Sequence, residues 1–276
     1  MRRSALEPPC QFANFRRAGA RQGTPQAVRY RVPLRPENAL RGPLPRSGPA
    51  GLLRLRSGGA RRLADAQEIR PDPQHGAAGR RQHRNGVIHK ETHEKFLESL
   101  GAAIDECGAA GCPKIITVGE QRKGMSNAEG ADNAVAFLNR MKARAEDKGV
   151  TMCVEVMNSK FDRPDQMCDH LAWGVDVIQR VNSPRVKILY DVYHAQIMDG
   201  DICRNIQRNF RWIAHFHTGG VPGRHEIDET QELNYRFIAK TIADLGYTGY
   251  IAHEFRPTPG RDPLQSLQEA IEIMTV

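Results

Sequence analysis

The feature that most constrains the fold is a regular alternation of short apolar runs and amphipathic segments after residue 86. The apolar runs predict strands at residues 114–118, 150–156, 186–192, 212–217 and 250–255. Helical periodicity predicts helices at residues 91–111, 133–148, 201–210, 233–245 and 263–274, with a further helix inside 164–181 and a loop at 119–130. Such alternation is typical of a parallel sheet built from strand–helix–strand units.

The number of strands limits how complete this sheet can be. A chain of 276 residues has the length of a (β/α)8 barrel, which takes about 250 residues. The alternating region supplies the last five strand positions, so residues 1–85 would have to supply three strands and two helices. We find no sustained strand or helix period there, and the apolar piece at 51–55 is the nearest thing to a strand. We therefore predict an α/β fold of the TIM-barrel type that is incomplete.

Charge divides the chain into the same two parts. Residues 1–85 hold 18 Arg, no Lys and five acidic residues, a net charge of +13, whereas the remainder holds 22 basic and 27 acidic residues, a net charge of −5. Ten of the 17 prolines also precede residue 86. Such a segment buries too little apolar area to offset the entropy of ordering it. We expect a low-order basic segment at 1–85 and a barrel domain at 86–276.

Three interpretations of the basic segment differ in what they imply for function. An arginine-rich arm can bind nucleic acid through phosphate contacts, and a basic tail can bind a partner protein. We favour a third interpretation, in which the segment is not native to this fold. Abundant Arg, Pro, Gly and Ala without Lys is typical of out-of-frame translation of a GC-rich gene. Under that interpretation we expect no nucleic-acid partner.

Polar residues stand at matching places in four consecutive units, each at the carboxyl end of an apolar strand. They are Glu155, Asp191, His217 and Glu254. Their separations of 36, 26 and 37 residues lie near the roughly 31 residues of one barrel repeat. Successive strands would then aim all four at one spot above the barrel mouth, where such barrels place their active sites. Three converging carboxylates need a cation, and oxygen ligands with one imidazole suit Mg²⁺, Mn²⁺ or Co²⁺.

Longer motifs in the same region resemble the hydroxypyruvate isomerase family, within the xylose-isomerase-like barrels that include the ketose 3-epimerases. The motifs are VEVMNSK at 154–160, LYDVYHAQ at 189–196, HFH at 215–217, GRHEID at 223–228, ELNY at 232–235 and HEF at 253–255. The resemblance covers roughly two-thirds of the chain, from about residue 86 to 276. It implies a metal-dependent isomerase that interconverts a small hydroxy-ketone or keto acid and its aldehyde by proton transfer through an enediolate.

The resemblance also implies a role for individual residues. The four strand-end residues match the family's divalent-metal ligands, and two of them, Glu155 and Glu254, match its proton-transferring glutamates. His194 and Arg224 match positions that contact substrate oxygens. Some hydroxypyruvate isomerases carry Gln at the third ligand position, where this chain has His217 as the 3-epimerases do. A ketose 3-epimerase or another sugar isomerase therefore stays open as an alternative.

Two further polar residues and two other functions also need consideration. We expect Glu120 to be a solvated loop charge and His253 to point away from the barrel axis. A metal-dependent nuclease barrel would need more His ligands than the one in this set. An inactive barrel fragment that displays the basic arm to nucleic acid is the alternative from outside the enzyme class.

Bulk features set the expected location and partners. No apolar run reaches the 18 or more residues of a membrane helix, and no signal segment follows the Met-Arg-Arg start, so we expect a cytoplasmic protein without a membrane partner. The six cysteines form no C-x-x-C pair and are expected to be reduced and buried. A small-molecule substrate is the expected ligand, and a homo-oligomer is expected because barrels of this group often pair.

Overall fold

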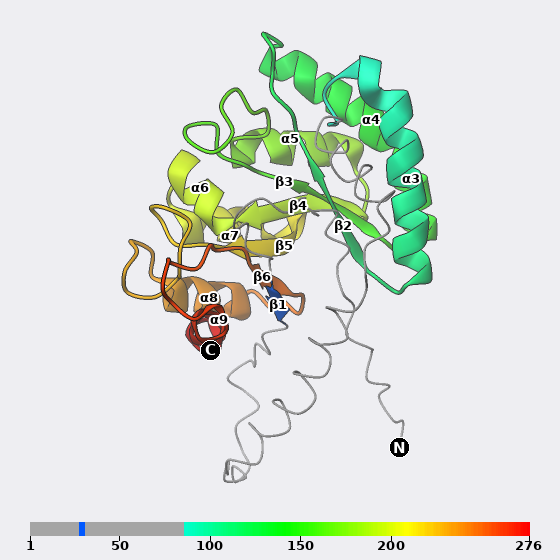
Figure 1. Ribbon diagram of the computed structural model, residues 1–276. Coiled ribbons are helices and arrows are strands. Elements are labelled where there is room, and N and C mark those ends of the chain that lie inside the picture. Colours follow the sequence, from blue (N-terminus) through cyan, green and yellow to red (C-terminus); the bar gives the residue numbers. More distant parts are fainter. Residues whose placement is uncertain (1–27, 31–85) are drawn as a thin grey trace, which may run out of the picture.

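The computed structural model describes residues 28–30 and 86–276, and a single sheet runs through that part of the chain (Figure 1). The predictions for the remainder of residues 1–85, including the apolar piece at 51–55, lie outside the described residues. The strands are β1 (Val28–Tyr30), β2 (Lys114–Val118), β3 (Thr151–Glu155), β4 (Val186–Asp191), β5 (Ile213–Thr218) and β6 (Ile251–His253). All five strands predicted after residue 86 are present.

The sheet is the parallel part of a barrel wall. Its strand order is β1-β6-β5-β4-β3-β2, with every pair from β2 to β6 parallel and β1 antiparallel to β6. Among the described residues the sheet stays open, because β1 and β2 form its two edges. The prediction of an incomplete TIM-barrel-type fold is confirmed for this part of the chain. The short antiparallel strand β1 was not predicted.

Helices follow the strands in turn and cover the outer face of the sheet (Figure 1). They are α3 (His93–Ala109), α4 (Asn127–Asp147), α5 (Leu171–Val181), α6 (Val192–Met198), α7 (Ile202–Asn209), α8 (Tyr235–Asp244) and α9 (Pro263–Met274), with 3-10 turns η2 (Lys90–Thr92) and η3 (Phe210–Trp212). The helix predicted at 263–274 has the predicted bounds, and α5 ends where Asn182 takes a left-handed φ of 49°.

The core lies between the sheet and these helices. In β4, Ile188 and Tyr190 are fully buried in that core, and Tyr190 meets Phe216 of β5 with ring centroids 6.2 Å apart. Since successive side chains of a strand point to opposite faces, Leu189 and Asp191 face the barrel interior. The period of two thus places Ile188 and Tyr190 in the core and turns Asp191, the last residue of the strand, toward the barrel interior.

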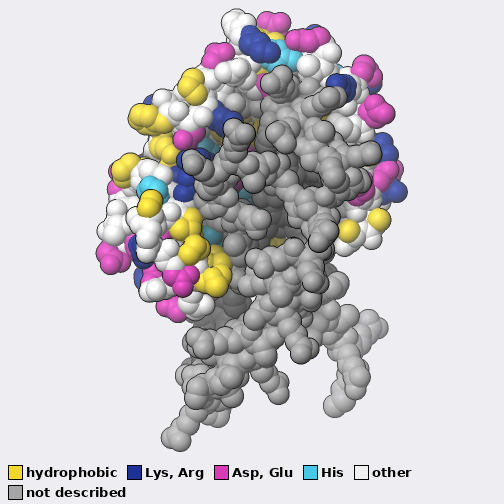
Figure 2. Space-filling model, viewed as in Figure 1, with side chains coloured by type: hydrophobic (Ala, Val, Ile, Leu, Met, Phe, Trp, Pro, Cys, Tyr) yellow, Lys and Arg dark blue, Asp and Glu magenta, His cyan; other side chains and the backbone are white. Residues whose placement is uncertain are grey.

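On the part of the described domain that Figure 2 leaves visible, charged side chains of both signs are intermixed. Exposed ion pairs join neighbouring helices. Arg140 of α4 pairs with Glu94 of α3, and Arg180 of α5 pairs with Asp132 of α4. Each such exposed pair is worth only about 0–1 kcal/mol, so the buried core dominates stability. Within the described residues, no helix combines the length and apolar character required to cross a membrane.

Two helical features differ from the prediction. Helix α4 begins at Asn127 and not at residue 133, because the Ser126 side chain accepts a hydrogen bond from Glu129 N at 3.2 Å and caps the helix. The signal was present, since Ser126 followed three residues later by Glu129 is a capping-box pattern. Helix α6 was not predicted, and it follows β4 without an intervening loop.

The Ser126 cap makes a testable contribution to stability. Replacing Ser126 by Ala removes the acceptor for Glu129 N, and we expect the free energy of unfolding to fall by about 1 kcal/mol. Ser126→Asp keeps an acceptor at the same position and is expected to stay near the wild-type value. Urea unfolding of the three proteins measures both differences. Equal losses in the Ala and Asp variants would show that the cap contributes nothing.

Candidate metal centre

The four strand-end residues predicted as ligands converge in the structure. Glu155 and Asp191 are the last residues of β3 and β4, His217 lies in β5, and Glu254 directly follows β6. One potential ligand atom from each lies within 4.8 Å of the corresponding atoms of the others. Asp191 and His217 are direct register partners across the β4–β5 ladder, so the parallel pairing itself brings them together. The four are almost fully buried, the Glu254 side chain being the most exposed at 10%.

Asp191 is held in place by two different interactions. Its Oδ1 accepts from Tyr193 N at 2.9 Å and thereby caps α6, which begins at the next residue. Its Oδ2 accepts from Arg224 Nη2 at 2.9 Å. One oxygen therefore anchors the carboxylate to the backbone, while the other faces the centre of the site.

Arg224 reaches directly into the cluster. Its Nη2 also donates to Glu254 Oε2 at 2.8 Å, and its guanidinium lies over the Tyr193 ring at 5.0 Å from the ring centroid. Its backbone has a left-handed φ of 60°, a conformation that costs a non-glycine residue about 1–3 kcal/mol and that clusters at functional sites. Two backbone hydrogen bonds hold it there, Arg224 N to Gly220 O and Arg256 N to Arg224 O.

The carboxylates shift the pKa values of both basic groups that contact them. Burial acts to lower the pKa of His217, but the charge of Glu254 and its hydrogen bond at 2.9 Å outweigh burial and raise that pKa above its ordinary value. Burial likewise opposes the charged form of Arg224, and the charges of Asp191 and Glu254 raise its pKa despite this. The cluster thus favours positive charge at its centre.

The donor set fits one divalent cation. Three carboxylates and one imidazole are ligands that Mg²⁺, Mn²⁺ and Co²⁺ accept. Two ligands on opposite sides of such an ion, with bonds of about 2.1 Å, lie about 4.2 Å apart. A group of atoms within 4.8 Å of one another therefore has the dimensions of a single coordination sphere.

A second hydrogen-bonded group stands beside the cluster. His194 of α6 is fully buried, and its Nε2 lies 3.7 Å from Asp191 Oδ2. Its Nδ1 is 2.7 Å from Nδ2 of Asn158, and the same Nδ2 donates to Asp162 Oδ2 at 2.8 Å. Burial lowers the pKa of His194 to about 4, so the ring is neutral near pH 7. His194 therefore lies beside the predicted ligands, as a substrate contact would.

Burial acts to raise the pKa of Asp162, but hydrogen bonds from Asn158 and Tyr193 outweigh it and keep that pKa below its ordinary value. Asn158 and Asp162 were not predicted as site residues. The signal was weak, because Asn158 stood in a motif without an assigned role and Asp162 lies four residues further along.

The expectation that Glu120 is solvated was wrong. The structure buries Glu120 after β2, with its Oε2 at 3.9 Å from His89 Nε2, and burial raises its pKa. It is therefore not the solvated loop charge that was expected.

His253 hydrogen-bonds to Thr218 at 2.7 Å, on the strand face opposite to the neighbouring His217. This agrees with the prediction that His253 points away from the barrel axis.

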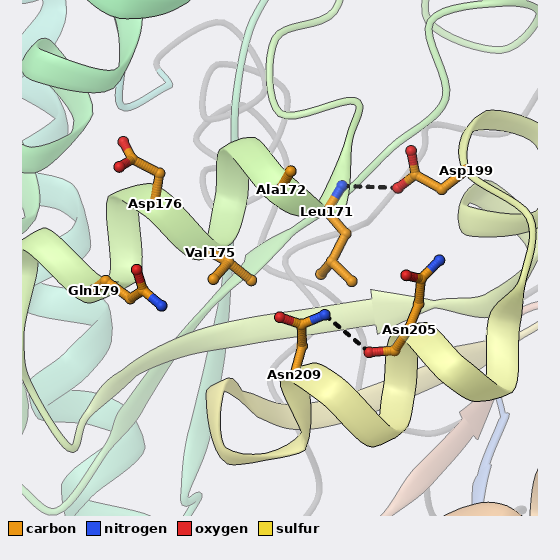
Figure 3. A pocket seen from close by; sticks show the side chains of 8 residues that line it. All are labelled: Leu171, Ala172, Val175, Asp176, Gln179, Asp199, Asn205 and Asn209. Atoms are coloured by element: carbon orange, nitrogen blue, oxygen red, sulfur yellow. Dashed lines mark hydrogen bonds between the residues drawn. The ribbon is translucent and has the colours of Figure 1, made fainter.

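The described surface also has a groove between α5 and α7 (Figure 3). Its volume is about 510 Å³, and its lining includes Leu171, Asp199 and Asn205. Leu171 N donates to Asp199 Oδ2 at 2.9 Å, so Asp199 serves the start of α5. None of the predicted site residues lines this groove.

The Arg224 contacts predict a large effect on stability. Replacing Arg224 by Met in the metal-free protein leaves buried carboxylates without their guanidinium partner, and we expect the free energy of unfolding to fall by about 3 kcal/mol. Adding Glu254→Gln to that variant removes one of the carboxylates and should recover part of the loss. Urea unfolding in the presence of a chelator measures both, with Arg256→Met as an exposed control. A loss no larger than that of the control would contradict this account.

Comparison with known proteins gives relatives in one enzyme group. A candidate hydroxypyruvate isomerase of Danio rerio is 29% identical over 170 residues, which cover 59% of this chain and 61% of the relative. A 2-oxo-tetronate isomerase of Cupriavidus necator is 29% identical over 170 residues, covering 60% and 63%. The chain thus spans a little over 60% of the length of these relatives.

Solved structures agree on the fold. A structure titled AP endonuclease, family 2, from Brucella melitensis matches with a TM-score of 0.59 and 27% identity, covering 62% of this chain and 66% of that one. A D-psicose 3-epimerase of Clostridium cellulolyticum matches with a TM-score of 0.58 at 18% identity, covering 70% and 75%, and supports the fold alone. The family model described as xylose isomerase-like TIM barrel matches residues 74–275. The chain belongs to the xylose isomerase-like TIM barrel family.

Proposed function

We propose that this protein is a metal-dependent isomerase that interconverts a small hydroxy-ketone or keto acid and its aldehyde, as the name hydroxypyruvate isomerase describes. The observation that carries the proposal is the convergence of Glu155, Asp191, His217 and Glu254 within 4.8 Å. The relatives named as isomerases support the same reaction class. A Mg²⁺, Mn²⁺ or Co²⁺ ion held by these four residues would supply positive charge that stabilises negative charge on the substrate oxygens.

The reaction itself needs a proton acceptor and a proton donor. Moving a carbonyl to the adjacent carbon removes the proton from the hydroxyl-bearing carbon, forms an enediolate and returns a proton to the former carbonyl carbon. The hydroxyl proton passes to the former carbonyl oxygen in the same conversion. Glu155 and Glu254 stand on different strands, β3 and the end of β6, with His217 of β5 between them at 3.8 and 2.9 Å. We assign them as the pair that abstracts and returns the proton.

The remaining polar groups suit substrate binding. Arg224 lies at the site with its guanidinium directed at Asp191 and Glu254, and a guanidinium binds a carboxylate through two parallel hydrogen bonds. We assign Arg224 to the substrate carboxylate or an equivalent oxygen pair, for which it exchanges one of its present contacts. His194 is assigned to a second substrate oxygen because its Nε2 lies beside Asp191.

Two other functions are weighed against this one. A ketose 3-epimerase would use the same proton-transferring pair on a longer sugar, and it would return the proton to the carbon that lost it, on the opposite face. A nuclease is favoured less, although one structural relative is titled AP endonuclease, because the cluster supplies a single imidazole among four ligands. The alternative from outside the enzyme class is nucleic-acid binding by the basic N-terminal segment.

Activity and its dependence on Glu155 test the proposal. We expect the full chain supplied with Mn²⁺ to convert hydroxypyruvate to its aldehyde isomer, to lose activity when a chelator removes the ion, and to regain it when Mn²⁺ returns. Glu155→Gln keeps the size of the side chain but cannot accept a proton, so turnover should fall by about 10²–10⁴-fold. Enzyme-coupled detection of the aldehyde measures the rate.

The matched control is Glu232→Gln, because Glu232 is exposed and bonds to Gln196 at 3.1 Å. Its turnover should equal that of the wild type. Hydroxypyruvate conversion at the wild-type rate in Glu155→Gln or in the chelated protein would refute the proposal. Conversion of D-fructose to its C3 epimer, without conversion of hydroxypyruvate, would establish the epimerase alternative.

A further inference from the structure

The amide of Asn158 has only one orientation that satisfies its neighbours. Its Oδ1 faces two backbone donors, Phe161 N at 3.1 Å and Asp162 N at 2.9 Å. A backbone N–H can only donate, so the atom that faces these two groups must be the amide oxygen. The nitrogen end of Asn158 therefore points the other way, toward Asp162 and His194.

Both hydrogens of that nitrogen are then assigned. Nδ2 donates one hydrogen to Asp162 Oδ2 at 2.8 Å, and it lies 2.7 Å from Nδ1 of His194. A donor facing a ring nitrogen at this distance requires a lone pair on that nitrogen. The single proton of the neutral His194 ring must therefore sit on Nε2.

The protonated nitrogen of His194 faces the ligand cluster. Among the described residues Nε2 has no hydrogen-bond partner, although His194 is fully buried. The Oδ2 atom of Asp191 lies 3.7 Å from Nε2, beyond hydrogen-bonding distance. A buried N–H that lacks a partner costs free energy, and a ligand atom that accepts a hydrogen bond would remove that cost.

Asp162 keeps this arrangement fixed. It receives hydrogen bonds from the Asn158 amide and from the Tyr193 hydroxyl, so its carboxylate serves as an acceptor for both. Tyr193 precedes His194 on α6, and its ring packs against the His194 ring with centroids 5.1 Å apart. The loop after β3 and helix α6 are thereby joined through the residues that orient His194.

We propose that Asn158 is a positioning residue that locks His194 in the tautomer protonated at Nε2, so that the imidazole presents one hydrogen-bond donor to the substrate beside Asp191. The use made of that donor rests on the proposed isomerase function, whereas the tautomer does not. A substrate oxygen at this position must accept a hydrogen bond, as a ketone or carboxylate oxygen does. An ammonium group, which only donates, is rejected there.

The tautomer is measured by long-range ¹H–¹⁵N correlation spectra of the full chain labelled in its histidine rings. The signals of His194 are identified by their absence in His194→Gln. We expect the wild-type protein, with Mg²⁺ and after chelation, to carry its proton on Nε2. A wild-type ring protonated at Nδ1 would overturn the proposal without any variant.

A charge-conserving exchange tests the role of Asn158. In Asn158→Asp/Asp162→Asn the group that faces Nδ1 becomes an acceptor while the loop keeps its net charge, so we expect the proton to move to Nδ1. Asp162→Asn alone is the matched control, because the new side-chain oxygen still accepts from Asn158 and the tautomer should stay unchanged. If the proton remains on Nε2 in the double variant, Asn158 does not set the tautomer.

Kinetics separate this inference from the proposed function. We expect the double variant to lose about 10- to 100-fold in kcat/KM for hydroxypyruvate, the range found when a group that orients a functional histidine is removed. A double variant that changes tautomer yet keeps wild-type kcat/KM would show that the donor is not used by the substrate. A wild-type protein that holds the Nε2 tautomer but converts no substrate would refute the isomerase and leave the role of Asn158 intact.

Discussion

Repulsion among buried carboxylates is the constraint on which the site depends. Glu155, Asp191 and Glu254 bring three negative charges to one point that is almost closed to solvent. Such charges stay ionised only when cations or hydrogen bonds compensate them. In the described structure Arg224 donates hydrogen bonds to Asp191 and Glu254. Its backbone takes a left-handed conformation to do so, which costs free energy. A divalent ion would offer greater compensation at the same point.

The architecture explains why these charges meet at all. Parallel strands end at the same edge of the sheet, and the period of two turns every second side chain toward the barrel interior. Strands β3, β4 and β5 and the residue after β6 supply the four candidate ligands, and α6 supplies the Tyr193 N–H that donates to Asp191. The candidate site is therefore contained in residues 86–276, the part of the barrel that the structure describes.

Sequence reasoning predicted the elements that depend on a local pattern. The strands and the four candidate ligands follow from apolar runs that end in a polar residue, and the structure brings those residues together. The contact of Arg224 with Asp191 and the Asn158–His194 pair were not predictable in this way, because Arg224 and Asn158 lie in loops, where no strand or helix period fixes the direction of a side chain. The burial of Glu120 was missed for the same reason, because the neighbouring sequence does not indicate which other segments pack over it.

The central claim is that one divalent ion binds between four side chains from neighbouring strands. Anomalous diffraction from crystals of the full chain grown with Mn²⁺ tests this most directly, because it locates the ion without reference to activity. The account predicts one strong peak per chain, within about 2.2 Å of an oxygen or nitrogen atom of Glu155, Asp191, His217 and Glu254. A peak held by other residues, or crystals with Mn²⁺ in the medium and no peak at these four side chains, would contradict it.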